Sequence, residues 1–495
     1  MWGSLSSLIR TRPVAASFSV FFVVISLWSG SVPMFGSPDE TAHMVRAAGL
    51  VRGQVDGVKG ADDLIRYDVP AILLPAPPCF AFKPDVTADC LSLAADDGNT
   101  MVATTASTYP PAFHLVTGLP TLVTDGLTSL YLMRLMNALV CAGLLAWSLV
   151  NCLQLAQGRV VAAAIPLALT PMVLFLSGTV NPSGVSAASG LAIWTAAFVL
   201  LEPTAQRAVG RSAAAFGVPF CLLILSRRDS LLWSAAILTV LAVLVPLPRA
   251  RDLLRIRSVQ TWIVLIGLTA GAHYVLWTRG NADGFDASSA STAGGNAGAA
   301  FGLAFNYFRE VIGVMGWLDT RLPAIVHLVW WAGLVGLAFV ALAVARGRSV
   351  AALILTVVLV IGITSWISSI RFPYFQGRYY LPLAVGAPLI AARGIGEAGF
   401  DRLRGRIIAT GFGCLYLLHQ VAFAQQMRRY AVGVTGPWDF AVTDHRWEPT
   451  PAPIWFFLVA YAVASAAMML VIASMTLEPT TRPEPAASTR PNQEG

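Results

Sequence analysis

The sequence has little charge for its length, since only 12% of its 495 residues are Asp, Glu, Lys or Arg. Lysine is nearly absent, occurring only at Lys59 and Lys83, a bias typical of GC-rich bacterial genomes. There is no Walker loop, no dinucleotide-binding fingerprint, no zinc-type cysteine spacing and no convincing internal repeat. These absences argue against a P-loop or dinucleotide-binding enzyme, a zinc-finger protein and a repeat array.

Apolar residues, by contrast, are abundant. They make up 56% of the chain, and the mean hydropathy is +0.67, values typical of polytopic membrane proteins. A helix needs about 20 residues to cross a hydrocarbon core about 30 Å thick. Apolar runs of roughly this length lie at 14–33, 130–150, 160–178, 183–201, 230–247, 260–278, 323–345, 349–368, 406–425 and 453–475. Shorter runs at 212–226 and 380–392 bring the expected fold to an all-α bundle of about 12 transmembrane helices.

The arginines predict how this bundle is oriented, because short cytoplasmic loops carry an excess of basic residues. Arginine-rich short loops lie at 202–211, 248–257, 345–348 and 393–406. We therefore expect a multi-pass protein of the bacterial plasma membrane with both termini in the cytoplasm. The string "SRRDS" at 226–230 fits this scheme least well, because the scheme places Arg227 and Arg228 outside.

The same scheme divides the chain into one transmembrane domain, 1–475, and a tail, 476–495. The tail is rich in Pro, Thr and Glu, so we expect it to be disordered in the cytoplasm. Three segments of the domain are expected outside the membrane: a long first extracytoplasmic loop containing short helices, a flexible Gly/Ala/Ser loop and a last outer loop, at 34–129, 280–302 and 428–452. Within the first of them, a proline-bounded apolar stretch at 109–123 is expected to dip into the interface without crossing.

The six cysteines fall into two groups. Cys79 and Cys90 lie together in the first outer loop, where an oxidising compartment favours a disulfide. The others fall in or beside apolar runs, where cysteine is usually a small buried hydrophobe, at Cys141, Cys152, Cys221 and Cys414.

The string "SPDETAH" at 37–43 follows the first apolar run directly and carries the acidic pair Asp39 and Glu40. It fits a helix start in which Ser37 is the N-cap and Glu40 completes a capping box. In that interpretation both carboxylates only complement the helix dipole, each stabilising by about 0.3–1 kcal/mol. The alternative is chemical, because a carboxylate fixed in direction at a helix start suits a general base. His43 lies one turn after Asp39, so the two could share a metal ion or a sugar hydroxyl.

Two groups of basic residues are candidates for binding an anion near the outer surface. Arg134 lies within the apolar string "SLYLMRLMNALV", where a charge is costly and is either functional or snorkels to the headgroups. Arg371 and Arg378 lie in "SSIRFPYFQGRYYLPL". An aromatic belt with arginine anchors at the membrane interface is the alternative interpretation of this string. We expect Arg378 to bind phosphate, because its planar fork matches phosphate oxygens. Gln376 or Tyr379 would contact a sugar, and Arg227 and Arg228 are weaker candidates.

Five strings carry a family resemblance: "SPDETAH" at 37–43, "YPP" at 109–111, "YLMRLMNAL" at 131–139, "NPSG" at 181–184 and "QGRYYLPL" at 376–383. They resemble a bacterial family of predicted multi-spanning membrane proteins of unknown function. That family is itself similar to the GT-C superfamily of integral membrane glycosyltransferases. An acidic pair directly after the first of about 12 spans is also typical of GT-C enzymes.

The resemblance implies transfer of a sugar from a polyprenyl-phosphate donor to a cell-envelope glycan or lipid acceptor at the extracytoplasmic face. It assigns the catalytic role to Asp39 with Glu40 beside it, and substrate contacts to His43, Tyr109, Arg134, Arg371, Gln376, Arg378 and Tyr379. Some GT-C enzymes use a divalent cation and others need none, so a metal stays open, with Asp39 and His43 as its ligands. Besides this substrate we expect membrane lipids as partners, and no nucleic acid.

Two other functions compete with the glycosyltransferase. A transporter or flippase of a lipid-linked glycan would use the outer charges to guide an anionic headgroup, although transporters place charged sites near the bilayer midplane and often have related halves. A polymerase or ligase of surface polysaccharide would be centred on the arginine-rich string at 371–380 together with His445 and Arg446.

Overall fold

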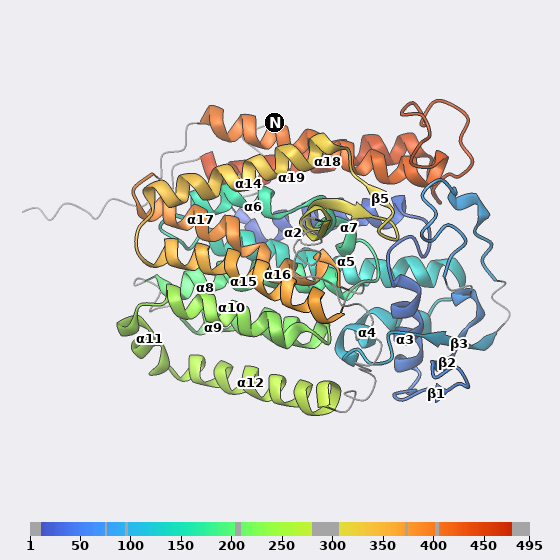
Figure 1. Cartoon of the computed structure of the whole chain (residues 1–495), viewed down its shortest axis with the longest axis horizontal. Coiled ribbons are helices and arrows are strands. Elements are labelled where there is room, and N and C mark those ends of the chain that lie inside the picture. The colour runs from blue at the N-terminus through green and yellow to red at the C-terminus, as the bar shows by residue number, and fades with distance from the viewer. Residues whose placement is uncertain are drawn as a thin grey trace, which may run out of the picture.

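The computed structural model is a bundle of long, roughly parallel helices with a smaller group of short elements at one end (Figure 1). It describes residues 11–74, 77–94, 98–202, 209–279, 306–371, 375–400 and 405–477. The predicted flexible loop at 280–302 and nearly all of the predicted tail at 476–495 lie outside the described residues.

Among the described residues, nine helices are long and apolar enough to cross a membrane. They are α2 (Pro13–Ser31), α5 (Gly126–Cys152), α8 (Pro182–Leu201), α9 (Val209–Ser226), α12 (Arg257–His273, continued by a π-helical turn to Arg279), α14 (Ala324–Val344), α15 (Arg348–Arg371), α18 (Gly405–Val432) and α19 (Ile454–Leu477). Two helix pairs, each sharply bent, bring the number to as many as eleven: α6 (Gly158–Ala168) with α7 (Pro171–Ser177), bent by 75°, and α10 (Ser230–Leu244) with α11 (Leu247–Leu254), bent by 116°.

The expected count of about 12 is therefore not reached in the described part of the chain. The apolar run predicted at 380–392 forms α16 (Leu381–Ala384) and α17 (Gly386–Glu397), and neither helix is long enough to qualify as a span. They follow a single 3-10 turn, η8 (Gly377–Tyr380), that connects to α15. This short, broken element lies in the interior of the bundle, where it carries candidate site residues rather than facing lipid.

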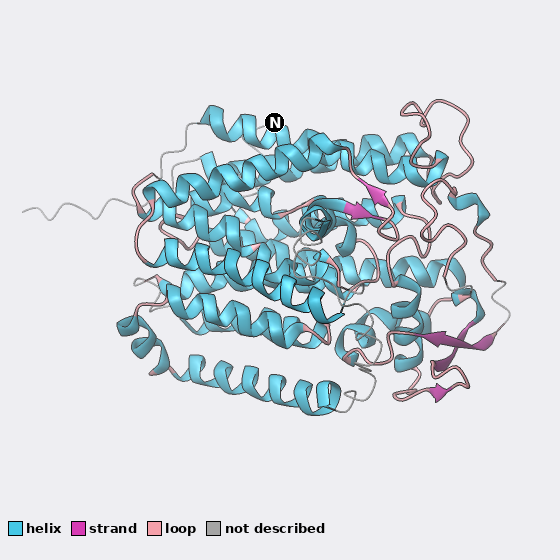
Figure 2. Cartoon of the chain, viewed as in Figure 1, coloured by secondary structure: helices cyan, strands magenta, loops and turns pink. Residues whose placement is uncertain are grey.

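The segment 34–129, predicted to be the first outer loop, contains more than the expected short helices. Figure 2 shows strands beside α3 (Glu40–Val51) and α4 (Pro111–Gly118). They form a three-stranded antiparallel sheet in the order β1 (Val58–Lys59), β2 (Ile65–Pro70) and β3 (Asn99–Thr104). A second small sheet pairs β4 (Val314–Met315) with β5 (Thr320–Arg321), so the chain is mostly helical, as expected, with two small sheets that were not predicted. Strand β2 does alternate, with Ile65, Tyr67 and Val69 against Arg66 and Asp68, and the prediction missed this signal, whereas β1, β4 and β5 have only two residues each.

The same segment contains three short 3-10 turns, η1 (Ala71–Leu73), η2 (Ala88–Cys90) and η3 (Leu119–Leu122). The stretch predicted to dip without crossing forms α4, which has 8 residues, followed by η3. At about 1.5 Å per residue, a helix of that length is far too short to span a bilayer.

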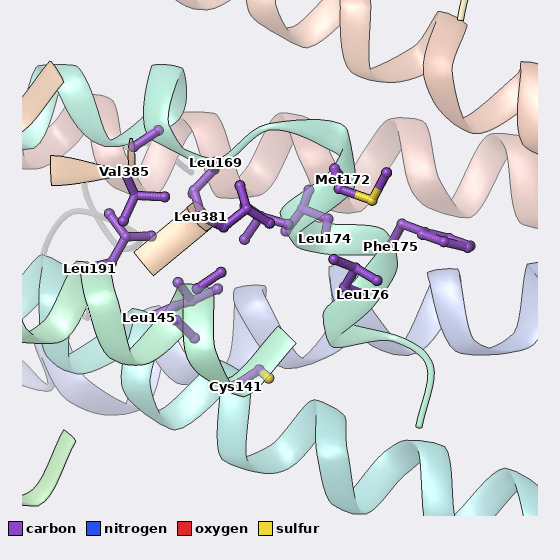
Figure 3. Packing of buried hydrophobic residues seen from close by; sticks show 14 of the residues in the cluster. Cys141, Leu145, Leu169, Met172, Leu174, Phe175, Leu176, Leu191, Leu381 and Val385 are labelled. Atoms are coloured by element: carbon purple, nitrogen blue, oxygen red, sulfur yellow. The ribbon is translucent and has the colours of Figure 1, made fainter. Parts of the chain in front are cut away.

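The core beneath this end is packed from segments distant in sequence (Figure 3). Apolar side chains of α5, of the α6–α7 bend, of α8 and of α16 interdigitate, among them Leu145, Leu174, Leu191 and Leu381. Helix α8 is 94% buried and lies at the centre. A Cβ on Gly190 of α8 would come within 2.6 Å of Pro382, so only glycine allows this close approach. Helix α16 is thereby fixed against the core.

Cys79 and Cys90 form a disulfide, with their Cα atoms 6.2 Å apart, as the sequence predicts. Two of the other four cysteines, Cys141 and Cys152, are buried, while Cys414 is exposed on α18. Arg429 of α18 holds the disulfide-closed loop by donating to the carbonyls of Phe80, Lys83 and Val86. The loop is thus tied to the last part of the bundle.

We expect maleimide labelling of the detergent-solubilised protein to distinguish the disulfide from free thiols. Cys79 and Cys90 should react only after treatment with a reductant, since the thiols are joined. Peptide mass spectrometry separates the sites, and the Cys79→Ser/Cys90→Ser double variant is the control. Labelling of Cys79 or Cys90 before reduction would show that the bond is not formed.

Candidate functional site at the start of α3

The chain between α2 and α3 is held by its backbone carbonyls, which side chains from distant elements use as acceptors. Arg134 donates to the carbonyls of Ser29, Val32 and Pro33. Trp317 donates to the Phe35 carbonyl at 2.9 Å, Tyr430 to that of Gly36 at 2.6 Å, and Asn181 to that of Pro38 at 3.0 Å. Each bond satisfies a buried polar group that would otherwise be costly. The four donors come from α5, from the β4–β5 turn, from α18 and from the start of α8, so the segment is fixed from several sides.

Helix α3 begins at Glu40, and the predicted capping box at Ser37 is wrong. Asp39 has a φ of +63°, in the left-handed region, and makes no side-chain cap bond. The Ser37 hydroxyl instead accepts a hydrogen bond from Thr179, and the Glu40 carboxylate is engaged by Arg134. Left-handed backbone is uncommon outside glycine, although aspartate tolerates it better than most residues. Here the captured carbonyls on the N-terminal side hold it in place.

The positive φ of Asp39 sends the two neighbouring carboxylates in different directions. Glu40 is fully buried and accepts two hydrogen bonds from Arg134, at 2.8 and 2.7 Å, and a third from the Val180 amide at 3.0 Å. Arg134 is also fully buried, and all its N–H directions end on Glu40 or on the three carbonyls named above. Arg134 therefore has no donor left for a ligand.

Asp39 turns the other way and is partly exposed, with 39% of its side chain accessible. It forms an ion pair with Arg378 of η8, which is only 2% exposed. The Nε and Nη1 groups of Arg378 are buried and have no hydrogen-bond partner among the described residues. Unsatisfied donors of this kind on a buried cation are costly, so these two groups of Arg378 call for an explanation.

A second arginine, missed as a strong candidate in the sequence, lies beside Arg378. Arg227, in the break between α9 and α10, places its guanidinium carbon 4.0 Å from the centre of the Tyr379 ring, and Arg378 lies 5.6 Å from the same centre. Arg227 also lies 5.8 Å from the Tyr109 ring. It is anchored by Asp229 at 2.8 Å and by the Ser183 hydroxyl at 2.9 Å. The string at 226–230 is thus on the same face as the first outer segment.

The position of Arg378 depends on a tight backbone contact. A Cβ on Gly377 would come within 2.3 Å of the Tyr307 carbonyl, so glycine is required there. The Gly377 amide donates to the Glu310 carboxylate at 2.6 Å. Burial raises the pKa of Glu310. Gln376, the residue before this turn, has a buried side-chain oxygen without a partner among the described residues.

A pair of histidines closes the other side of the site. His43 Nδ1 lies 3.1 Å from His114 Nε2, and His114 Nδ1 lies 3.1 Å from the Pro110 carbonyl. Both rings are buried, and the His43 ring stacks edge-on against Tyr109 at 4.9 Å. Burial and then the charges of Arg227 and Arg378 lower the pKa of His43 well below its usual value. Burial raises the pKa of Tyr109 to about 12, so both groups are neutral near pH 7.

The structure brings Asp39, His43, Tyr109, Arg378 and Tyr379 together, and Gln376 lies next to them in the chain. It places Glu40 and Arg134 in a separate buried ion pair behind Asp39. The side chain of Arg371 lies outside the described residues. His445 lies in the loop after α18 and contacts Glu448 at 3.7 Å. No group of three or more potential metal ligands occurs in the described ranges, so a metal site gains no support from Asp39 and His43.

Residues that the sequence did not single out complete the site. His114 was part of the apolar stretch after "YPP", and its only signal was that a histidine interrupted that stretch. Ser183 and Asn181 belong to the "NPSG" string, to which the sequence analysis assigns no site role. Ser183 accepts a hydrogen bond from Arg227, and Asn181 donates one to the Pro38 carbonyl.

The long apolar helices and the charged groups collected at their ends define a polytopic membrane protein. Residues 21–387 match the family described as "Predicted membrane protein (DUF2142)", and the chain belongs to that family. This match confirms the membrane-protein family expected from the sequence strings. Neither a curated protein nor a solved structure matches the chain.

We expect Glu40→Gln to destabilise the protein by about 3–5 kcal/mol, because it leaves the buried Arg134 cation without its counter-charge. Asp62→Asn is the matched control, since it removes the carboxylate from an exposed bidentate pair with Arg66. Such a surface pair contributes little to stability, because water and salt screen the two charges. The measurement is denaturant unfolding in detergent micelles. Equal stability of the two variants would contradict the structural role of the Glu40–Arg134 pair.

Proposed function

We propose that this protein transfers a sugar from a polyprenyl-phosphate donor to a cell-envelope acceptor, as GT-C glycosyltransferases do. The observation that carries the proposal is Arg378, a buried guanidinium with two N–H groups that no described residue uses. Together with Arg227, which also contacts the Tyr379 ring, it offers two cations at one place. A phosphate bound beside them would accept hydrogen bonds from the unused donors of Arg378.

The chemistry of glycosyl transfer needs such a place. As the bond between the sugar and the phosphate breaks, negative charge develops on the phosphate oxygens, and fixed cations stabilise that charge. Arg227 is held by Asp229 and Ser183, and Arg378 by Asp39, so neither cation has to reorganise during the reaction. Asp39 uses one carboxylate oxygen for Arg378, which leaves its other oxygen for a hydroxyl of the sugar or the acceptor.

An apolar groove next to Arg378 suits the lipid part of the donor. It has a volume of about 250 Å³ and lies between α14, α15 and the α16–α17 segment. Tyr380 and Leu381 line it, directly after Arg378 and Tyr379 in the chain, and Trp331, Val357 and Pro388 are among its other lining residues. Helices α14 and α15 are only 17% and 28% buried, so the groove borders the surface that faces lipid. A prenyl chain in this groove would carry its phosphate toward Arg378.

The position of the charges favours the enzyme over the transporter. Asp39 precedes α3, Arg227 lies between α9 and α10, and Arg378 lies between α15 and α16. All three are at helix ends on one side of the bundle, whereas transporters hold their charged sites near the midplane. The polysaccharide polymerase is less well supported, because His445 is paired with Glu448 in the loop after α18.

We expect a strain that lacks this protein to accumulate a polyprenyl-phosphate-linked sugar and to lose one sugar from an envelope glycan or lipid. Arg378→Lys should behave like the deletion, because lysine keeps the charge but loses the planar fork. Arg393→Lys is the matched control, since Arg393 also pairs with a carboxylate, Glu397, but outside the site. Lipid extracts and envelope glycans are compared by mass spectrometry. Unchanged lipid-linked sugars in the deletion strain would reject the proposal, and loss of an entire glycan would favour the flippase.

A further inference from the structure

The hydrogen bonds of the histidine pair fix which ring nitrogens carry protons. The Pro110 carbonyl can only accept, so His114 Nδ1 must carry a proton and donate it over 3.1 Å. Because neutral imidazole carries one proton, His114 Nε2 then has a lone pair. That lone pair accepts from His43 Nδ1, also over 3.1 Å. His43 therefore carries its proton on Nδ1 and its lone pair on Nε2.

The remaining nitrogen, His43 Nε2, makes no hydrogen bond to any described residue. The charged neighbours of His43 are Arg227, from the break between α9 and α10, and Arg378, from η8. Asp39 lies one turn before it on the same segment, and Tyr109 and His114 face it from the side of α4. On the side of the sheet, Arg46 and Tyr67 bond each other. The lone pair of His43 is thus the uncommitted basic group within the cluster that would hold the donor.

We propose that His43 is the base that accepts the proton of the acceptor hydroxyl, and that His114 is the positioning residue that keeps His43 in the required tautomer. This inference rests on the proposed glycosyl transfer and assigns to His43 the role that the family resemblance gave to Asp39. Asp39 then keeps its contact with Arg378.

The reaction step balances as follows. The acceptor oxygen attacks the anomeric carbon and forms the new glycosidic bond, while the bond from that carbon to the phosphate oxygen breaks. The electron pair of the broken bond stays on the phosphate, between Arg227 and Arg378. The hydroxyl proton moves to His43 Nε2, and His114 Nε2 stabilises the resulting imidazolium by accepting from Nδ1. The proton leaves with the polyprenyl phosphate or to water.

Because Arg227 and Arg378 lie near His43, we expect the pKa of His43 to depend on whether the donor is bound. Without a ligand, burial and the two cations hold the pKa of His43 well below its usual value. A bound phosphate neutralises the cations, so the pKa of His43 should rise when the donor binds. The base form is lost as the pH falls through this pKa. The acid limb of kcat, which reports the donor complex, should therefore lie at higher pH than the acid limb of kcat/KM, which reports the free protein.

One arm of the test needs no activity. In the full-length protein labelled with 15N-histidine and reconstituted in nanodiscs, NMR should show a proton on Nδ1 and none on Nε2 of both His43 and His114. Addition of farnesyl phosphate should raise the pKa of His43. The His114→Gln variant assigns the signals. A proton on Nε2 of His43, or a pKa that farnesyl phosphate leaves unchanged, would overturn the inference.

The second arm uses the donor fraction extracted from the deletion strain. His43→Asn should lower kcat about 10²–10⁴-fold with little change in KM. His114→Phe should lower kcat about 10–100-fold, as loss of an orienting partner does, and His114→Gln should recover part of it because its amide oxygen can accept from His43. His327→Asn, on α14 outside the site, is the control.

The outcomes separate the two proposals. If the wild-type protein transfers sugar and His43→Asn keeps full turnover, the base role fails and the glycosyltransferase stands. If the wild-type protein transfers no sugar, the proposed function is wrong, and the base role of His43 is wrong as well.

Discussion

The structure depends on one buried ion pair. Arg134 of α5 uses its guanidinium to hold both oxygens of Glu40 and three backbone carbonyls at the end of α2. A buried cation that is fully hydrogen-bonded fixes its partners strongly, because breaking any one contact exposes an unpaired charge to an apolar interior. The link between α2 and α3 consequently has a single conformation, and the rest of the site is built on it. Asn181 at the start of α8, Trp317 in the β4–β5 turn and Tyr430 of α18 then complete the frame.

This frame gives two adjacent carboxylates opposite roles. Glu40 is fully bonded to Arg134 and the Val180 amide, whereas Asp39, in left-handed backbone, pairs with a different buried arginine, Arg378. The arginines divide in the same way, since Arg134 has all its donors occupied and Arg378 has two unused. Arg134 and Arg378 are both buried, so the unused donors, and not burial, are the reason for proposing Arg378 as the ligand-binding group. The same criterion separates His43, which has a free lone pair, from His114, which has both nitrogens engaged.

Much of this arrangement could be predicted from the sequence, but not all of it. Apolar runs give the spans because every backbone polar group in lipid must be satisfied within a helix, and the loop cysteines give the disulfide. The strings around Asp39, Tyr109 and Arg378 also meet in space. The predicted capping box at the start of α3 was wrong because such a box is a local pattern. Here Thr179 bonds the Ser37 side chain and Arg134 bonds the Glu40 side chain instead. The partner of Arg134 and the pairing of His43 with His114 are contacts between residues far apart in sequence, which local patterns do not encode.

The central claim is that Arg227 and Arg378 hold a phosphate beside Asp39 and His43. The most direct measurement is a cryo-electron microscopy structure of the protein in nanodiscs with a polyprenyl phosphate. We expect phosphate density bonded to Nε and Nη1 of Arg378 and next to Arg227. The prenyl chain should lie in the groove beside Tyr380, and Arg134 should remain bound to Glu40. Phosphate bound elsewhere, with the two nitrogens of Arg378 still vacant, would contradict it.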